Sequence, residues 1–127
     1  MIVLDSSGWI EFFADGPHAA EFAARLRKPA DVIASTVAIY EVYKWIKRER
    51  SEDEALAAVA TMKKTTVVDL TEEIALTAAD LSLAHGLAMA DAMMLAFARE
   101  NRAELLTTDS GFEGITGVTV YSKKTKS

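Results

Sequence analysis

Short apolar runs alternate with longer amphipathic segments along this chain of 127 residues. Runs rich in aliphatic and β-branched side chains indicate buried strands, and they lie at residues 2–4, 32–34, 65–70, 104–107 and 118–121. Segments with helical spacing of apolar positions cover residues 6–14, 17–27, 36–50, 51–62, 71–85 and 89–101. Because strands separated by helices favour a parallel sheet covered on both faces, the pattern predicts an α/β fold with a central parallel sheet of about five strands.

Residues at the ends of these segments support the same elements. Ser6 or Ser7 is expected to cap the first helix, and Pro17 is expected to begin the second. Gly86 is the expected end of the helix at 71–85. The polar tail at 122–127 is expected to fray. No linker or repeat divides the chain, so one domain over residues 1–127 is expected.

Composition narrows the class of protein. Half of the residues are apolar and 26% are charged, which is typical of a soluble globular protein. No apolar run approaches the roughly 18–20 residues that span a membrane, and the N-terminus lacks the pattern of a signal peptide. Without cysteine, disulfides and thiolate nucleophiles are excluded. These features favour a cytoplasmic location.

The net charge of −5 lowers the expectation of nucleic-acid binding, because phosphate contacts require basic residues. Basic residues nevertheless gather in three clusters. These are Lys44, Lys47, Arg48 and Arg50, then Lys63 and Lys64, and then Lys123, Lys124 and Lys126. The first two clusters can guide RNA toward an acidic site or form solvated helix faces, and both interpretations stay open.

Four acids lie where the strands are expected to end. Asp5 follows the first strand, Asp109 follows the fourth, Glu41 lies six residues after Ser35, and Asp91 opens the apolar part of a helix. Each has an alternative structural role, as a helix cap, a solvated residue, a first-turn acid or a turn residue. Chemistry in open α/β sheets gathers at the carboxyl ends of strands, and a divalent cation such as Mg²⁺ stabilises converging carboxylates. Together the acids predict metal-dependent chemistry at a phosphate.

Four segments carry a resemblance to a known family. They are VLDSS at 3–7, STVAIYEV at 35–42, ADAMMLA at 90–96 and LTTDSGF at 106–112. In order and spacing they resemble the motifs of the PIN-domain ribonucleases, most closely the VapC-type toxins of bacterial and archaeal toxin–antitoxin pairs. The resemblance covers essentially the whole chain and implies a PIN-like three-layer sandwich.

The resemblance also implies a site for Mg²⁺ or Mn²⁺, with one or two ions. Asp5 and Asp91 would be the main direct ligands, and Asp109 and Glu41 would complete the cluster directly or through water. The small polar side chains expected to line the site are Ser7, Ser35 and Thr107. Such a site would activate water for attack on an RNA phosphodiester.

One position departs from the family pattern. Many relatives carry a second acid two residues after the one at Asp109, where this chain has Gly111. Glu113, which follows Phe112, is not expected to replace it. The departure leaves the number of metal ions open.

The implied partners are an RNA substrate, a small antitoxin with an apolar helical tail, and a second copy of the chain in a homodimer. Aromatic side chains are expected to lie partly in the core and partly in a groove for a partner helix. They are Phe12, Phe13, Tyr40, Tyr43 and Trp45. Four methionines are expected in the core, namely Met62, Met89, Met93 and Met94.

Other functions fit less well. An aspartyl-phosphate phosphatase needs a second acid two residues after the first, where this chain has Ser7. A phospho-receiver domain needs an acidic neighbour of Asp5 that is absent here. His18 and His85 are expected to have no catalytic role. A nuclease outside a toxin–antitoxin pair and a non-catalytic interaction module remain as alternatives, although four intact acids argue against the second.

Overall fold

A computed structural model of the chain describes residues 1–122, and in it five parallel strands form one sheet with the order β3-β2-β1-β4-β5. The strands are β1 (Ile2–Leu4), β2 (Val32–Ser35), β3 (Thr66–Val68), β4 (Glu104–Thr107) and β5 (Val118–Val120). The predicted parallel sheet is therefore confirmed. The expected frayed tail lies outside the described residues, except for Ser122.

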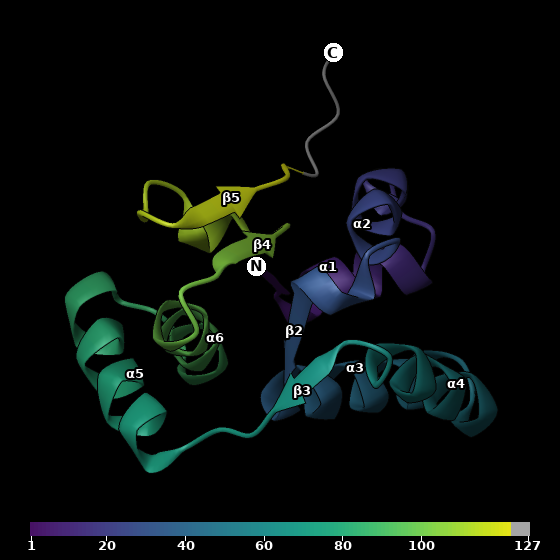
Figure 1. Ribbon diagram of the computed structural model, residues 1–127, viewed down its shortest axis with the longest axis horizontal. Coiled ribbons are helices and arrows are strands. Elements are labelled where there is room, and N and C mark those ends of the chain that lie inside the picture. Colours follow the sequence, from purple (N-terminus) through teal and green to yellow (C-terminus); the bar gives the residue numbers. More distant parts are fainter. Residues whose placement is uncertain (123–127) are drawn as a thin grey trace.

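Helices cover both faces of the sheet. They are α1 (Ser6–Phe13), α2 (Ala19–Leu26), α3 (Thr36–Glu49), α4 (Glu52–Met62), α5 (Glu72–His85) and α6 (Met89–Glu100). Figure 1 shows α5 and α6 on one side of the sheet and α1 to α4 on the other. The expected three-layer α/β arrangement is confirmed. Among residues 1–122, no single helix is long and apolar enough to cross a membrane.

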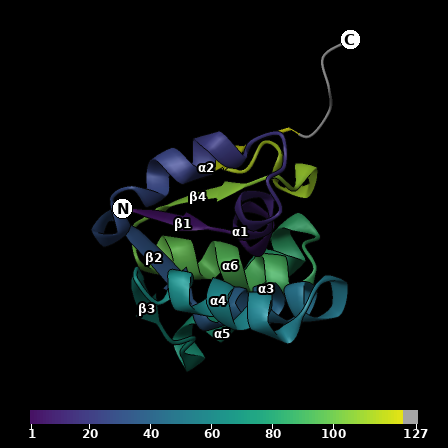
Figure 2. The same ribbon diagram turned by 90° about the vertical axis from the view of Figure 1, so that its right-hand side faces the viewer.

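The strand order contains one reversal of direction. From β1 the chain moves outward through β2 to β3 and then returns to β4 on the other side of β1. Figure 2 shows β1 and β4 side by side, with α1 starting where β1 ends. Ligands of open α/β sheets bind outside the carboxyl ends of the strands at such a switch point. The fold therefore predicts a ligand site at the carboxyl ends of β1 and β4.

Two helix starts differ from the prediction. Ser6 and Ser7 do not cap α1; Asp5 does, as its alternative structural role predicted, because its carboxylate accepts a hydrogen bond of 2.8 Å from the Ser6 amide. The second helix begins at Ala19, two residues after Pro17. Gly86 ends α5 as predicted, in a left-handed conformation with φ of 68° that a residue without Cβ adopts readily.

The core lies between the sheet and its helices, with Val3, Leu4, Leu105 and Leu106 of the two central strands fully buried. Met62 and Met94 are buried and Met93 is partly buried, as expected. The prediction for Met89 was wrong, since 72% of this residue is exposed. Met89 is the first residue of α6 and lies beyond the part of the helix that packs on the sheet.

Candidate active site

Asp5 and Asp109 follow the two neighbouring strands β1 and β4. The parallel register pairs Leu4 with Leu106, and the Asp5 amide donates to the Leu106 carbonyl at 2.9 Å, which extends the ladder by one residue. Only 2% of Asp5 is exposed. The backbone therefore fixes the Asp5 carboxylate at the switch point of the sheet.

A hydroxyl network holds this carboxylate. Thr107 Oγ1 donates to Asp5 Oδ2 at 2.9 Å and accepts from the Asp109 amide at 3.0 Å. Ser7 Oγ lies 3.1 Å from Asp5 Oδ2 and 3.0 Å from Thr107 Oγ1, and it accepts from the Thr108 amide at 3.0 Å. The network joins the first turn of α1 to the end of β4, and Ser7 and Thr107 both contact Asp5.

Asp109 begins the short 3₁₀ helix at Ser110–Phe112 and caps it. Its Oδ1 accepts a hydrogen bond of 2.8 Å from the Gly111 amide. A Cβ atom on residue 111 would lie 3.1 Å from that same oxygen, a tight contact. The missing side chain at Gly111 therefore leaves room for the Asp109 carboxylate. Glu113 is exposed.

Glu41 and Asp91 reach the cluster from helices on opposite faces of the sheet. Glu41 is half-buried on α3, and the Ser6 side chain hydrogen bonds to its carboxylate. Asp91 is half-buried in the first turn of α6, and Asp109 favours its protonated form both by its charge and as an acceptor for the carboxyl proton. From the sequence, Ser6 was expected only to cap a helix. Its position directly after Asp5 could have predicted that it lies beside the site.

The electrostatics show that the four carboxylates share one region. Burial raises the pKa of Asp91 to about 7, and the negative charges of Asp5, Asp109 and Glu41 add to this effect. Burial also raises the pKa of Asp5, against the hydrogen bonds from Thr107, Ser6 and Ser7. The pKa of Glu41 is raised mainly by burial, with a further contribution from Asp5. The structure thus brings all four predicted acids together.

The donor set fits a hard divalent cation. Oxygen ligands and excess negative charge are what Mg²⁺ prefers, and it commonly binds through one or two carboxylates while keeping several waters. Within residues 1–122, no three His, Asp or Glu side chains converge closely enough to enclose an ion by themselves. A cation bound at this cluster would therefore keep water in several of its coordination positions.

Ser35 uses its hydroxyl away from the acids. Its Oγ accepts from the Ala38 amide at 3.2 Å, which caps α3, and donates to Met94 Sδ at 3.3 Å. Ser35 is fully buried. Its expected place in the lining of the site stays a prediction.

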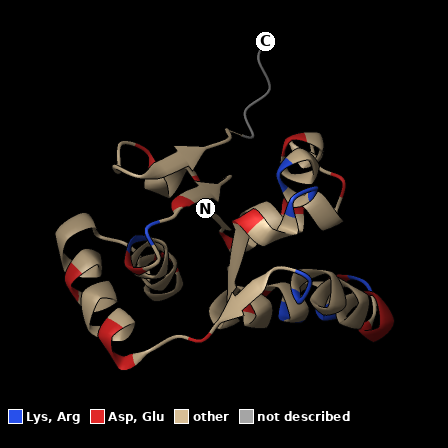
Figure 3. Ribbon diagram, viewed as in Figure 1, with Lys and Arg blue, Asp and Glu red and all other residues tan. Residues whose placement is uncertain are grey.

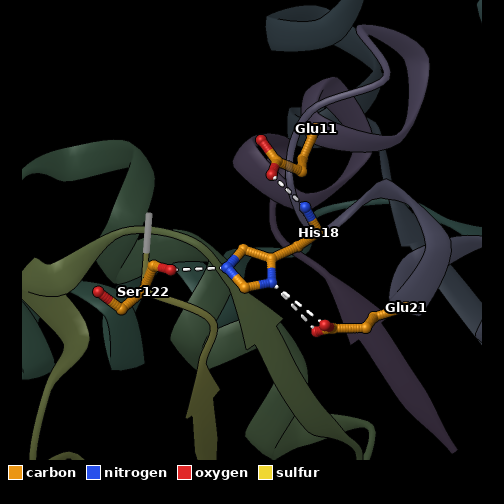
Figure 4. Close-up of polar contacts among 4 residues, drawn as sticks. All are labelled: Glu11, His18, Glu21 and Ser122. Atoms are coloured by element: carbon orange, nitrogen blue, oxygen red, sulfur yellow. Dashed lines mark hydrogen bonds and ion pairs between the residues drawn. The ribbon is translucent and has the colours of Figure 1, made fainter. Parts of the chain in front are cut away.

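His18 lies apart from the acid cluster. Figure 4 shows its ring between Glu21 of α2 and the backbone of Ser122, with Nε2 2.6 Å from the Ser122 carbonyl oxygen and Nδ1 3.2 Å from the Glu21 carboxylate. These two acceptors, Ser122 first, raise the pKa of His18. The Glu11 carboxylate accepts from the His18 amide at 2.8 Å. His18 therefore ties α2 to the end of β5.

Comparison with known proteins agrees with this geometry. The family model described as PIN domain matches residues 2–118. No curated protein sequence matches the chain significantly. Among solved structures, a toxin–antitoxin complex from Klebsiella pneumoniae is 26% identical, with a TM-score of 0.77 over 94% of this chain and 97% of that chain.

Two further structures are similar in fold. One is a VapC toxin from Mycobacterium tuberculosis that cleaves the sarcin–ricin loop. It is 18% identical, with a TM-score of 0.73 over 89% of this chain and 92% of that one. The other is a VapBC complex from Rickettsia felis bound to a promoter DNA fragment. It is 13% identical, with a TM-score of 0.72 over 95% of this chain and 98% of that one.

Proposed function

Because this chain belongs to the PIN domain family, we propose that it is a metal-dependent endoribonuclease that acts as the toxin of a toxin–antitoxin pair. The observation that carries the proposal is the gathering of Asp5, Glu41, Asp91 and Asp109 at the switch point, where burial, with the charges of the other three acids, raises the pKa of Asp91 to about 7. Such a cluster is costly without a cation and is suited to holding one.

Each acid has a proposed role. Asp5 and Asp91 hold the cation, Asp109 completes the site, and Glu41 acts directly or through water. Ser7 and Thr107 keep the Asp5 carboxylate in one orientation through their hydrogen bonds. Orientation matters because the ligands of a catalytic metal depend on their own hydrogen-bond partners.

Bound Mg²⁺ or Mn²⁺ would lower the pKa of a coordinated water and neutralise charge on the phosphate. The proposed reaction adds water across a phosphodiester. The water oxygen bonds to phosphorus, the bond to the leaving oxygen breaks, and that oxygen takes up a proton. Whether one or two ions are bound is open, since Gly111 supplies no further acid.

A groove between α1, α3 and α4 supports an antitoxin partner. It has a volume of about 260 Å³, and its wall includes Phe13, Ile46 and Ala57, with Arg50 and Glu54 at its charged positions. An amphipathic helix lays its apolar face into such a groove. The similar complex from Klebsiella pneumoniae is described as a toxin with its antitoxin, which favours this kind of partner.

Exposed apolar side chains on α5 and α6 support a homodimer. Leu76 and Leu83, two helical turns apart on α5, are 63% and 87% exposed, and Met89 is 72% exposed. A monomer rarely exposes a contiguous patch of large apolar side chains, so such a patch commonly marks an interface. We propose that a second copy of the chain covers this patch.

RNA cleavage tests the central proposal. We expect the purified protein to cut single-stranded RNA with Mg²⁺ or Mn²⁺ and to lose activity in a chelator. Asp5→Asn and Asp91→Asn should each lower the rate by at least about 100-fold, because a metal ligand is lost. The matched control is Asp31→Asn, which changes the same charge in the segment before β2, at the amino-terminal end of that strand, whereas Asp5 follows the carboxyl end of β1.

Two outcomes separate the alternatives. Activity that survives Asp5→Asn or Asp91→Asn would remove these acids from the site, and no cleavage under any metal would favour an interaction module. Toxicity is a second readout. Expression should arrest growth, and coexpression of a small neighbouring gene should relieve the arrest. Cleavage without toxicity would point to a nuclease in RNA processing outside such a pair.

A further inference from the structure

A pocket of about 220 Å³ lies beside the acid cluster, between the start of α1 and the exposed side of α3. Its wall includes Ser6, Tyr40, Glu41, Lys44, Trp45 and Arg48. Ser6 and Glu41 belong to the edge of the acid cluster, since the Ser6 side chain hydrogen bonds to Glu41. The pocket is thus continuous with the candidate active site and carries basic and aromatic side chains away from it.

Helical spacing explains why these residues share one face. Glu41, Trp45 and Arg48 stand at positions i, i+4 and i+7 of α3, while Tyr40 and Lys44 are four residues apart. At about 1.5 Å of rise per residue, Arg48 lies roughly 10 Å along the helix axis from Glu41. The stripe therefore begins at the acids and leads outward along α3.

The cations of the stripe are available to a polyanion. Lys44 Nζ lies 3.4 Å from the Tyr40 hydroxyl and 5.5 Å from the centre of the Tyr40 ring, an arrangement that keeps the charge beside an aromatic face. Arg48 Nε is 3.8 Å from Glu49, and both side chains are at least half exposed, so that ion pair is weak. Figure 3 shows Lys and Arg on α3, whereas α5 has Asp and Glu but no Lys or Arg.

We propose that this pocket binds the RNA nucleotide that flanks the scissile phosphodiester, with Lys44 and Arg48 on phosphate oxygens and Tyr40 and Trp45 against the base. The inference rests on the proposed ribonuclease function and adds the path of the substrate strand. Stacking on aromatic faces combined with a basic groove is the usual way to bind single-stranded RNA. In a chain of net charge −5, such a stripe offsets the repulsion between the acids and the RNA backbone.

An acidic segment of a protein partner is the competing occupant, and two observations favour RNA. Tyr40 is 61% exposed and Trp45 is partly buried, so both rings are partly open to solvent, as a stacking base requires. The pocket also includes Glu41, one of the four acids at which cleavage is proposed. An RNA strand bound at the acids continues either along α3 or away from it, and α3 carries the positive charges that attract its phosphates.

Kinetics with two substrates test the proposal. A random-sequence single-stranded RNA uses the pocket, whereas bis(p-nitrophenyl) phosphate is too small to reach beyond the acids. The double variant K44Q/R48Q should raise KM for the RNA by about 10-fold or more and change turnover of the small diester much less, since only the charge of Lys44 acts on an acid of the cluster, Glu41. Lys47→Gln is the matched control, because Lys47 lies on the same helix outside this pocket and 3.6 Å from Glu52. It should leave both substrates unaffected.

The salt dependence of RNA affinity provides a second quantitative test. For single strands, the slope of log affinity against log salt changes by about 0.7 for each phosphate neutralised. K44Q/R48Q should therefore flatten the slope by about 1.4 if each side chain meets one phosphate. Lys47→Gln should leave the slope unchanged.

Tryptophan fluorescence reports binding without any cleavage. Trp9 is fully buried, whereas Trp45 lines the pocket. With a chelator present to prevent cleavage, the same RNA should quench the wild-type emission, and Trp45→Phe should remove most of the quenching although Trp9 remains. This readout also separates the two proposals. If RNA quenches the fluorescence in a chelator but is not cut when Mg²⁺ or Mn²⁺ is present, the result would support RNA binding in the pocket and contradict the nuclease function.

Three results would contradict the proposal that this pocket binds RNA. One is RNA cleavage and binding that K44Q/R48Q leaves intact. Another is an equal loss in Lys47→Gln, which would show only a general charge effect. The third is a loss of affinity confined to a protein partner, with RNA unaffected, which would assign the stripe to protein docking.

Discussion

The Thr107 hydroxyl donates a hydrogen bond of 2.9 Å to Asp5 Oδ2, although the two residues are 102 positions apart in the sequence. The bond links the ends of β1 and β4, the two strands that flank the switch point. The same hydroxyl accepts from the Asp109 amide at 3.0 Å. One side chain therefore sets the relative positions of two acids of the cluster.

Replacing Thr107 should separate orientation from ligation. Thr107→Val keeps the shape but removes the hydroxyl, so Asp5 Oδ2 keeps only the Ser7 hydroxyl as a donor and the Asp109 amide loses its acceptor. We expect a loss of about 1–3 kcal/mol in the free energy of unfolding and a fall of about 10–100-fold in Mg²⁺ affinity. Chemical denaturation and a metal titration of activity measure the two effects.

Thr107→Ser is the control for this variant. Serine keeps the hydroxyl, so it should retain most of the metal affinity. If Thr107→Val keeps its Mg²⁺ affinity and Thr107→Ser loses it, the hydroxyl does not position Asp5 for the cation, and the packing of the threonine methyl group becomes the better explanation.

The raised pKa of Asp91 predicts how stability depends on pH in the absence of a cation. Its pKa is 3.8 in a free side chain and about 7 in the fold, so the folded state binds more protons between these values. Stability contributed by this group is therefore present at low pH and falls as the pH rises from about 4 to 7. Asp91→Asn should remove this loss.

Denaturation at several pH values in a chelator measures the difference between wild type and Asp91→Asn. Because Asp91 is half exposed, solvent screening reduces the effect, and we expect a gain of about 1–2 kcal/mol for the variant at pH 8 and little difference at pH 4. His18 has a raised pKa in both proteins and cancels in the comparison. A constant difference across the pH range would contradict the shift at Asp91.

Added Mg²⁺ should reverse the order of stability of wild type and Asp91→Asn. A cation that binds the folded state stabilises it, so wild type should gain stability from added Mg²⁺ and Asp91→Asn should gain much less. Asp31→Asn, with an exposed acid lost elsewhere, should behave like wild type in both series. Equal Mg²⁺ effects on all three proteins would separate Asp91 from the cation.

Hydrophobic spacing and β-branched runs were enough to predict the five strands and the parallel sheet, because both signals are local. The strand order is not local. It depends on which side of β1 the chain returns to after β3, and no local sequence pattern in residues 69–103 predicts that side. The proximity of Asp5 and Asp109 could be inferred, but the role of Thr107 as their link needed the register of β1 with β4.

Two individual errors have physical reasons. Ser6 and Ser7 are common capping residues, yet Asp5 stands at the strand end with extended backbone angles and takes the capping position itself. Met89 is apolar and adjoins a buried helix, yet it is the first residue of that helix and projects past the core. Residue type predicts burial along a helix better than at its ends.

The α1–α3–α4 groove predicts a way to uncouple inhibition from catalysis. Ala57 lies in this groove and is exposed, so Ala57→Glu would place a charged side chain where the helix of an antitoxin is expected. Affinity for the antitoxin should fall by at least about 10-fold, because an unpaired charge would be buried. RNA cleavage by the free enzyme should not change.

Ala60→Glu is the matched control for Ala57→Glu, since Ala60 is exposed on the same helix outside the groove. Isothermal titration against the purified antitoxin gives the affinities. Equal binding by wild type and Ala57→Glu would place the antitoxin on another face of the molecule.

The exposed patch on α5 and α6 predicts the oligomeric state. If Leu83 and Met89 lie in a homodimer interface, Leu83→Lys and Met89→Lys would bury a charge there and should produce monomers. Leu56→Lys is the control, because Leu56 is 53% exposed on α4, across the sheet from this patch, and its replacement should leave a dimer intact. Sedimentation equilibrium distinguishes the two states directly. A monomeric wild type, or dissociation by Leu56→Lys alone, would show that this patch does not hold two copies together.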